Sequence, residues 1–265
     1  MRICLAGWTG SGRHDSSSDI GWVEAATLSG SSDPTSEGRF TVGSRGRFIV
    51  LICAVRQLPA SLTSLPTVTR LDLATLVRPE WHPEAGVSRD CAVFGYVIDH
   101  PDGAILVDTG VGQGNAFIDD AYRPQCTDLH DALATAGVTL RSVVTVVNSH
   151  LHFDHCGQNP LLYGTDVAFF VGRLEIEQVD RDPYYTDSTW ALPPLHQRRL
   201  VDGDLEIAEG VTILSTPGHT AGHQSVLIDS DEGRIVIGAQ VVWNTQEFID
   251  EIATESNVDS EDLRI

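Results

Sequence analysis

The feature that most constrains this chain is a histidine-rich segment that directly follows a run of β-branched residues. Residues 143–147, VVTVV, are typical of a buried strand, and the chain continues as NSHLHFDH over residues 148–155. His150 and His152 are two apart, so in an extended backbone both imidazoles lie on one side, and Asp154 continues that side. Imidazoles and a carboxylate packed this closely indicate a site for a divalent metal, zinc above all.

A further histidine follows another predicted strand. The apolar residues 211–214 lead into STPGHTAGHQS over residues 215–225, where proline and glycines predict a tight turn that presents His219. A catalytic zinc has three protein ligands and one open position, which His150, His152 and His219 would supply. Water bound there would have a pKa near 7. The alternative is a polar loop that is rich in histidine by chance.

A carboxylate stands at the end of a third predicted strand. In ILVDTGVG, residues 105–112, Asp108 precedes a glycine-rich turn. Its side chain would either orient a metal ligand through a hydrogen bond or cap the turn. The residues alone leave both interpretations open.

The rest of the chain predicts many short strands and a few helices. Apolar runs at 93–98 and 104–107 flank a turn at 100–103 and predict a hairpin. Periodicity and turn residues predict further strands at 143–147, 167–171, 205–207, 211–214, 225–228 and 235–237, and helices over 129–136, 173–179 and 245–253. This pattern favours an α+β fold in which sheets pack together and helices cover them.

The first 66 residues differ in composition from the rest. They are rich in glycine and serine and show no sustained period, so we expect a largely disordered N-terminal extension at 1–66, followed by a folded domain at 67–265 that carries the histidine motifs. Within the extension, FIVLICAV at 48–55 is interpreted as a buried strand or an accident of composition rather than a signal peptide.

The net charge of the chain limits the kinds of molecule that it can bind. The net charge is −20, from 17 basic and 37 acidic side chains, which would repel nucleic acid and anionic membranes. Five cysteines without close pairing do not predict a disulfide framework, and no apolar run is long enough to span a bilayer. We therefore expect a cytoplasmic protein whose partner is a small-molecule substrate.

Taken in order, these elements resemble the metallo-β-lactamase-fold hydrolases. HLHFDH at 150–155 matches the pattern H-x-H-x-D-H of that superfamily, and DTG at 108–110 and TPGHTAGH at 216–223 match as well. The combination is most similar to the N-acyl-homoserine-lactone lactonase branch, over roughly residues 67–250. The resemblance implies an αββα sandwich with a dinuclear metal site at the sheet edge.

The resemblance also implies a role for each residue. Its ligand set is His150, His152 and His219 for the first metal, and Asp154 and His155 for the second. His223 is expected to be a structural neighbour rather than a ligand.

Two positions depart from the pattern of the branch. Gln240 stands where the family has an aspartate that bridges the metals, and a neutral amide is a poor bridge between two cations. Trp243 stands where the branch has a tyrosine that assists the lactone carbonyl, and an indole N–H is not an acid of similar strength. We therefore expect one firmly bound zinc and a weak or empty second site.

The C-terminal part also departs from the family. No histidine follows His223, although the family has a last histidine ligand there, and the chain is expected to lack the last C-terminal elements of the fold. An unpaired sheet edge would favour association, for example as a homo-oligomer.

These observations together predict a zinc-dependent hydrolase of an ester or lactone. Hydroxide formed at the metal would attack the carbonyl, and Asp154 would orient the water and move its proton. Two alternatives stay open: a thioester hydrolase of the glyoxalase II type, and a degenerate, non-catalytic member of the family.

Overall fold

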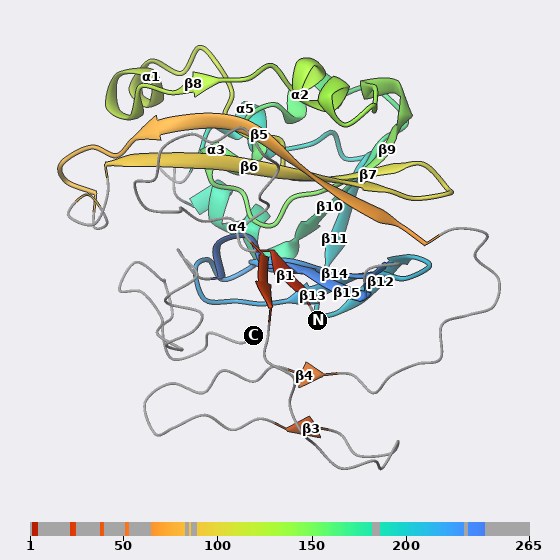
Figure 1. Cartoon of the computed structure of the whole chain (residues 1–265). Helices are drawn as coiled ribbons and strands as arrows, with labels where there is room; N and C mark the ends of the chain where they lie inside the picture. Colours follow the sequence, from red (N-terminus) through yellow and green to blue (C-terminus); the bar gives the residue numbers. More distant parts are fainter. Residues whose placement is uncertain are drawn as a thin grey trace.

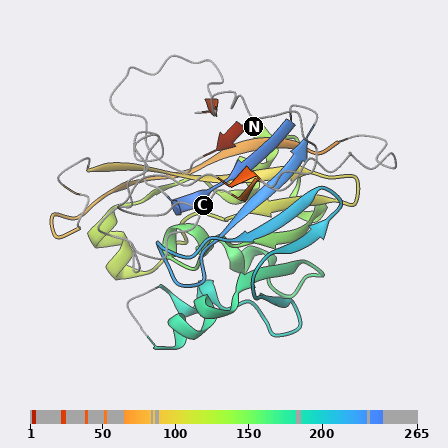
Figure 2. The same ribbon diagram turned by 90° about the horizontal axis from the view of Figure 1, so that it is seen from below.

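In the computed structural model, two sheets lie face to face (Figure 1; Figure 2). The structure describes residues 65–82, 85, 89–181, 186–230 and 233–241, together with the backbone of four short strands nearer the N-terminus. The larger sheet has seven strands in the order β11-β10-β9-β7-β6-β5-β8. These strands are β5 (Thr67–Val77), β6 (Asp90–Asp99), β7 (Ala104–Val107), β8 (Gln125–Cys126), β9 (Val143–Val147), β10 (Ala168–Gly172) and β11 (Arg198–Val201).

The smaller sheet has six strands in the order β12-β13-β14-β15-β1-β2. The strands are β12 (Leu205–Ala208), β13 (Val211–Ser215), β14 (Gln224–Ser230), β15 (Gly233–Ile237), β1 (Arg2–Cys4) and β2 (Trp22–Glu24). Strands β12 to β15 form an antiparallel meander, and β1 pairs with β15 in parallel. A separate pair is formed by β3 (Gly38–Arg39) and β4 (Leu51–Ile52).

Two hydrophobic cores follow from the alternation of side chains along the strands of the larger sheet. Leu106 and Val146 point to a core shared with the helices, whereas Ile105, Val107 and Val147 point to the core between the two sheets. The helices are α1 (Ala116–Tyr122), α2 (Leu129–Thr135), α3 (Phe153–Cys156), α4 (Arg173–Arg181) and α5 (Ser188–Ala191). Members of this set cover the outer face of the larger sheet, so the expected α+β fold with two facing sheets is confirmed.

Most elements that the sequence predicts are present within the described residues. The hairpin of β6 and β7 turns at His100–Gly103, α2 ends just before Gly137, and β9 has the predicted bounds. The predicted strands and helices near 168, 173, 205, 211, 225 and 235 correspond to β10, α4, β12, β13, β14 and β15. The predicted helix at 245–253 lies outside the described residues.

One local expectation was wrong. We expected Asp154 to continue the extended run of His150 and His152, but α3 begins at Phe153, so Asp154 lies in the first turn of a helix. His152 is the last extended residue, with φ −63° and ψ 154°. The turn carries Asp154 away from the face shared by the first two histidines.

Four short strands fall within the segment for which we predicted disorder, and β4 overlaps the predicted strand at 48–55. Apart from these strands and residues 65–66, residues 1–66 lie outside the described ones, so the boundary at residue 66 stays a prediction. The same holds for the C-terminal elements of the fold, because residues 242–265 are not described.

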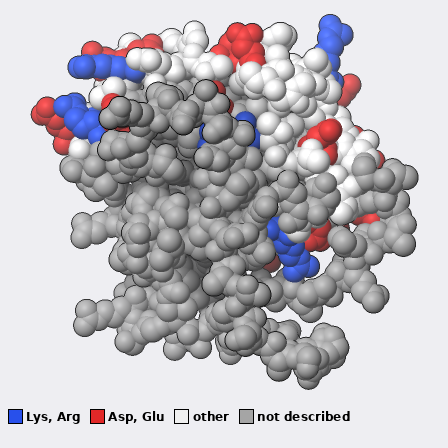
Figure 3. All heavy atoms as spheres, viewed as in Figure 1, with Lys and Arg blue, Asp and Glu red and all other residues white. Residues whose placement is uncertain are grey.

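The surface of the described part carries both signs of charge. Figure 3 shows acidic and basic side chains interspersed over the upper part of this face, without a continuous basic patch on the portion that is described. Among the described helices, none is long and apolar enough to cross a membrane.

Candidate metal centre

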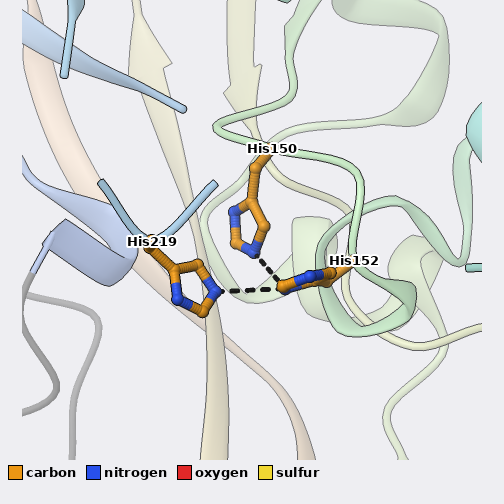
Figure 4. A group of neighbouring side chains, drawn as sticks. All are labelled: His150, His152 and His219. Carbon is orange, nitrogen blue, oxygen red and sulfur yellow. Dashed lines mark hydrogen bonds between the residues drawn. The ribbon is translucent and has the colours of Figure 1, made fainter. Parts of the chain in front are cut away.

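Three imidazoles meet at the seam between the two sheets. His150 and His152 follow β9 of the larger sheet, and His219 lies in the loop between β13 and β14 of the smaller one (Figure 4). His152 Nδ1 lies 3.0 Å from His150 Nε2 and 3.0 Å from His219 Nε2. One nitrogen from each ring thus lies within 4.8 Å of the other two.

This spacing fits a zinc ion. Two nitrogens bound tetrahedrally at about 2.05 Å from zinc lie about 3.3 Å apart, which is close to the two separations of 3.0 Å, and the third separation stays within 4.8 Å. The donor set also fits, because neutral imidazole is a preferred zinc ligand and three such ligands leave a fourth position open. The residues present therefore suit the metal that the sequence predicts.

The hydrogen bonds around His150 set which of its nitrogens faces the centre. Ser149 Oγ donates its proton to Asp108 Oδ2 at 2.7 Å, which leaves the hydroxyl oxygen to accept from His150 Nδ1 at 3.1 Å. With Nδ1 protonated, the lone pair of His150 is on Nε2, the atom that faces His152. A hydrogen bond to the other ring nitrogen is the usual way in which a protein orients a histidine ligand.

The electrostatics keep these rings uncharged. Burial lowers the pKa of His150 well below 6.5, and the neighbouring imidazoles of His155, His152 and His219 lower it further. Burial followed by the charges of the nearby histidines does the same to the pKa of His152. At neutral pH both rings are neutral and offer lone pairs, which is the state that a cation requires.

Asp108 joins the loop after β7 to the histidine segment. Its carboxylate accepts hydrogen bonds from Ser149 N, Ser149 Oγ and His155 Nδ1, each at 2.7 Å. Its φ of 61° is in the left-handed region, which is uncommon for a residue other than glycine. Of the two interpretations that the sequence left open, the geometry favours the orienting one.

His155 and Asp154 form a pair beside the three histidines. Burial lowers the pKa of His155, but the charges of Asp154 and Asp108 and hydrogen bonds to Asp108 and Gln240 outweigh it and raise the pKa to about 9. His155 Nε2 lies 3.6 Å from Asp154 Oδ2, and the Asp154 side chain is 14% exposed. Among the described residues, neither belongs to the group of closely spaced nitrogens formed by His150, His152 and His219.

The remaining candidates have different positions. His223 is buried, and its Nδ1 lies 2.9 Å from Thr216 Oγ1 and 3.1 Å from Thr216 O, in keeping with the structural role expected for it. Gln240 is buried beside His155. Trp243 lies outside the described residues.

Two residues near the site were missed by the sequence analysis. Ser149 connects Asp108 to His150, and the buried Glu175 of α4 accepts hydrogen bonds from both histidine-bearing loops. Neither belongs to a recognisable spacing, since Ser149 is an ordinary polar residue in the motif and Glu175 is one of several acidic residues in a helix.

An aromatic cluster lies next to the histidines. We use this name for Trp81, Phe117, Tyr122 and Phe153, whose rings form a chain with centroid separations of 6.5, 5.9 and 4.6 Å. Phe153 stands between His152 and Asp154 in the sequence, while Trp81 and Phe117 are 62% and 59% exposed. Large exposed aromatic surface of this kind marks binding sites.

Comparison with known proteins bears on these features. The family model for the metallo-beta-lactamase superfamily matches residues 88–250, more than half of the chain. The chain belongs to the metallo-β-lactamase superfamily. An N-acyl homoserine lactonase from Bacillus sp is 30% identical to this superfamily member over 176 residues, which cover 62% of this chain and 69% of the relative.

Solved structures of the superfamily agree with this assignment. The crystal structure of a quorum-quenching N-acyl homoserine lactone lactonase has a TM-score of 0.63 at 25% identity, covering 75% of this chain and 82% of that one. An N-acyl homoserine lactone hydrolase with the product N-hexanoyl-L-homoserine at its catalytic metal centre has a TM-score of 0.60 at 26% identity, covering 75% and 83%. The chain is thus a metal-dependent, lactonase-like hydrolase of this superfamily.

Proposed function

We propose that the chain is a zinc-dependent hydrolase of lactones or related esters, with an N-acyl-homoserine lactone as the favoured class of substrate. The observation that carries the proposal is the convergence of three imidazole nitrogens with two separations of 3.0 Å at the seam of the sheets. Zinc-type geometry and lowered pKa values support His150, His152 and His219 as its ligands.

We assign the residues of the site different roles in hydrolysis. Zinc bound by the three histidines would supply Lewis acidity and lower the pKa of a water molecule. Asp154, partly exposed in the first turn of α3, orients the attacking water and takes its proton. His155, held by Asp108, fixes the Asp154 carboxylate through the contact of 3.6 Å.

The aromatic cluster supports a substrate with an apolar chain. Asp154 acts on this cluster electrostatically, because burial followed by its charge raises the pKa of Tyr122 to about 12. Tyr122 contacts Phe153, the neighbour of Asp154 in the sequence, and it also contacts Trp81. The exposed rings of Trp81 and Phe117 offer an apolar surface to an acyl group. The related hydrolase that holds N-hexanoyl-L-homoserine binds a product of this kind.

We further propose that one zinc is bound firmly and that a second is weak or absent. The Nδ1 of His155 forms a hydrogen bond with Asp108, and the rest of the ring faces Asp154 and Gln240. Gln240 contributes a neutral amide where a second cation would need negative charge.

Zinc analysis together with a substrate panel tests the proposal. The purified chain should hold about one zinc and hydrolyse acyl-homoserine lactones faster than simple esters or thioesters. His152→Ala should lose both zinc and turnover, whereas His196→Ala, at an exposed position, should keep both. A His152→Ala protein that hydrolyses lactones like the parent would refute the proposal, and preferred cleavage of thioesters would favour the glyoxalase-type alternative.

A further inference from the structure

A single buried carboxylate lies between the two loops that carry the three histidines. Glu175, in the first turn of α4, accepts hydrogen bonds from Leu151 N at 2.9 Å through Oε2. Its Oε1 accepts from Thr220 Oγ1 at 2.6 Å and from Gly222 N at 2.9 Å. Hydrogen bonds to a charged acceptor are shorter and stronger than neutral ones, so this contact holds both loops firmly.

Two of the three donors lie next to the proposed ligands in the sequence, and the third, Gly222, lies three residues after His219. Leu151 stands between His150 and His152, and Thr220 follows His219. The two loops belong to different sheets, since one follows β9 and the other joins β13 to β14. A shift of either donor moves a ligand directly, so Glu175 sets the separation of the two halves of the site.

The backbones around Glu175 are packed too closely to allow an alternative arrangement. A Cβ on Gly222 would lie 2.7 Å from Glu175 N, and a Cβ on Gly172, the residue before α4, would lie 2.2 Å from Gly222 O. Both positions need glycine because the start of α4 lies directly against the loop of His219. The Glu175 contact is therefore one part of a tightly fitted junction between α4 and this loop.

We propose that Glu175 is a positioning residue that holds the loops of His150, His152 and His219 at the separation a metal ion needs. It acts through the backbone and through Thr220, not through contact with substrate. The inference rests on the proposed function, because the value of the arrangement lies in metal binding.

Glu175→Gln tests this with little change in shape. The amide keeps one oxygen acceptor and turns an NH₂ group toward at least one of the donors, so one loop loses its anchor. Zinc affinity, measured by competition with a chromogenic chelator, should fall about ten- to a hundredfold. Glu177→Gln is the matched control, since Glu177 lies on the same helix in an exposed ion pair with Arg181 and should leave the affinity unchanged.

A second readout does not depend on the metal. In the metal-free protein, the amides of Leu151 and Gly222 should exchange with solvent faster in Glu175→Gln than in the parent. If the parent binds no zinc, the proposed function fails, and amide exchange alone decides the role of Glu175. Unchanged exchange at both amides would overturn the inference.

A milder pair of variants covers the case in which Glu175→Gln does not fold. Thr220→Val removes only the hydroxyl donor, whereas Thr220→Ser keeps it. Zinc affinity should fall in Thr220→Val and return in Thr220→Ser, and the absorption spectrum of the cobalt-substituted site should change in the first variant alone. Parent-like affinity and spectrum in Thr220→Val would overturn the inference.

Discussion

Gln240 is the described residue that sets this site apart from the dinuclear pattern that the resemblance implies, and it lies beside His155. His155 donates to Asp108 from one ring nitrogen and lies beside Asp154 and Gln240 with the other side of its ring. A second cation placed there would meet an amide without charge. Substitution of Gln240 alone therefore tests why binding of a second metal is disfavoured.

Gln240→Asp is expected to create the second site. The added carboxylate lies near His155 and Asp154 and supplies the negative charge that a second cation needs. Zinc per chain, measured by mass spectrometry after dialysis, should rise from about one to about two. Gln240→Asn, which stays neutral, should remain at the parent value, and a Gln240→Asp protein with unchanged zinc content would contradict the prediction.

At the level of residues, the sequence predicts those parts of the metal site that lie in recognisable motifs after predicted strands. His150 and His152 are two apart after a strand, and His219 lies in a turn after another, so their types and positions suggested the convergence seen in the structure. Glu175 could not be found in this way. Its role depends on two loops, about 24 and 45 residues away along the chain, that meet only in the folded protein.

At the level of elements, the residue that follows α3 packs closely against the loop after β7. Gly157, directly after this helix, donates from its N–H to Gly110 O at 2.7 Å, and a Cβ at this position would lie 1.9 Å from Gly112 N. The helix that carries Asp154 and His155 is thus packed backbone to backbone against the loop that carries Asp108.

Gly157→Ala should accordingly destabilise the fold strongly. The methyl group would push the two backbones apart, at a cost of about 3 kcal/mol or more in the free energy of unfolding. Gly137→Ala provides the control, because φ there is +71° with nothing within 4 Å of the added Cβ, so only the left-handed backbone costs energy, about 1 kcal/mol. Urea unfolding of both variants measures the difference, and equal losses would refute the packing argument.

The aromatic cluster joins the loop after β5, helix α1 and helix α3 into one apolar surface. Trp81→Ala should raise the KM for a long-chain lactone about tenfold and that for a short-chain lactone less, with kcat little changed, because the role we propose for this exposed ring is to bind the acyl chain alone. Leu195→Ala, also exposed but outside the cluster, should leave both KM values unchanged. Equal effects on short and long chains would show that the ring does not bind the acyl group.

Several elements were missed from the sequence, among them α1, α5, β8 and β11, and two further ones, β5 and α3, show the physical reasons. In β5 the side chains do not alternate regularly, because the register with β6 shifts between Asp72 and Ala74 and places Leu73 and Ala74 both in buried positions. Helix α3 has four residues, too few for a helical period to appear. The hairpin of β6 and β7 was predictable because its turn and its apolar runs are contiguous.

For the molecule as a whole, the buried imidazoles predict how the stability of the metal-free chain depends on pH. The pKa values of His150, His152 and His223 are lowered in the fold, mainly by burial. Below pH 6.5 these histidines bind protons in the unfolded chain but stay neutral in the folded one. The free energy of unfolding therefore falls as the pH falls. His155 has its pKa raised to about 9, so its contribution is complete below 6.5 and is lost as the pH rises toward 9.

The contribution of these histidines to the free energy of unfolding should therefore be largest near pH 6.5 and should fall on both sides of it. Urea unfolding in the presence of a chelator measures this dependence on pH. His155→Asn should remove the loss on the alkaline side and keep the loss on the acidic side. A parent protein that gains stability steadily from pH 6.5 to about 9 would contradict the assignment of the His155 charge.

The position of the three histidines has a consequence beyond chemistry. Two of them extend from one sheet and the third from the other. An ion bound by all three would link the two sheets, so removing it would lower the stability of the sandwich as well as stop turnover. The lifetime of the protein in a cell would then follow the supply of zinc, and starvation for the metal would remove the enzyme itself.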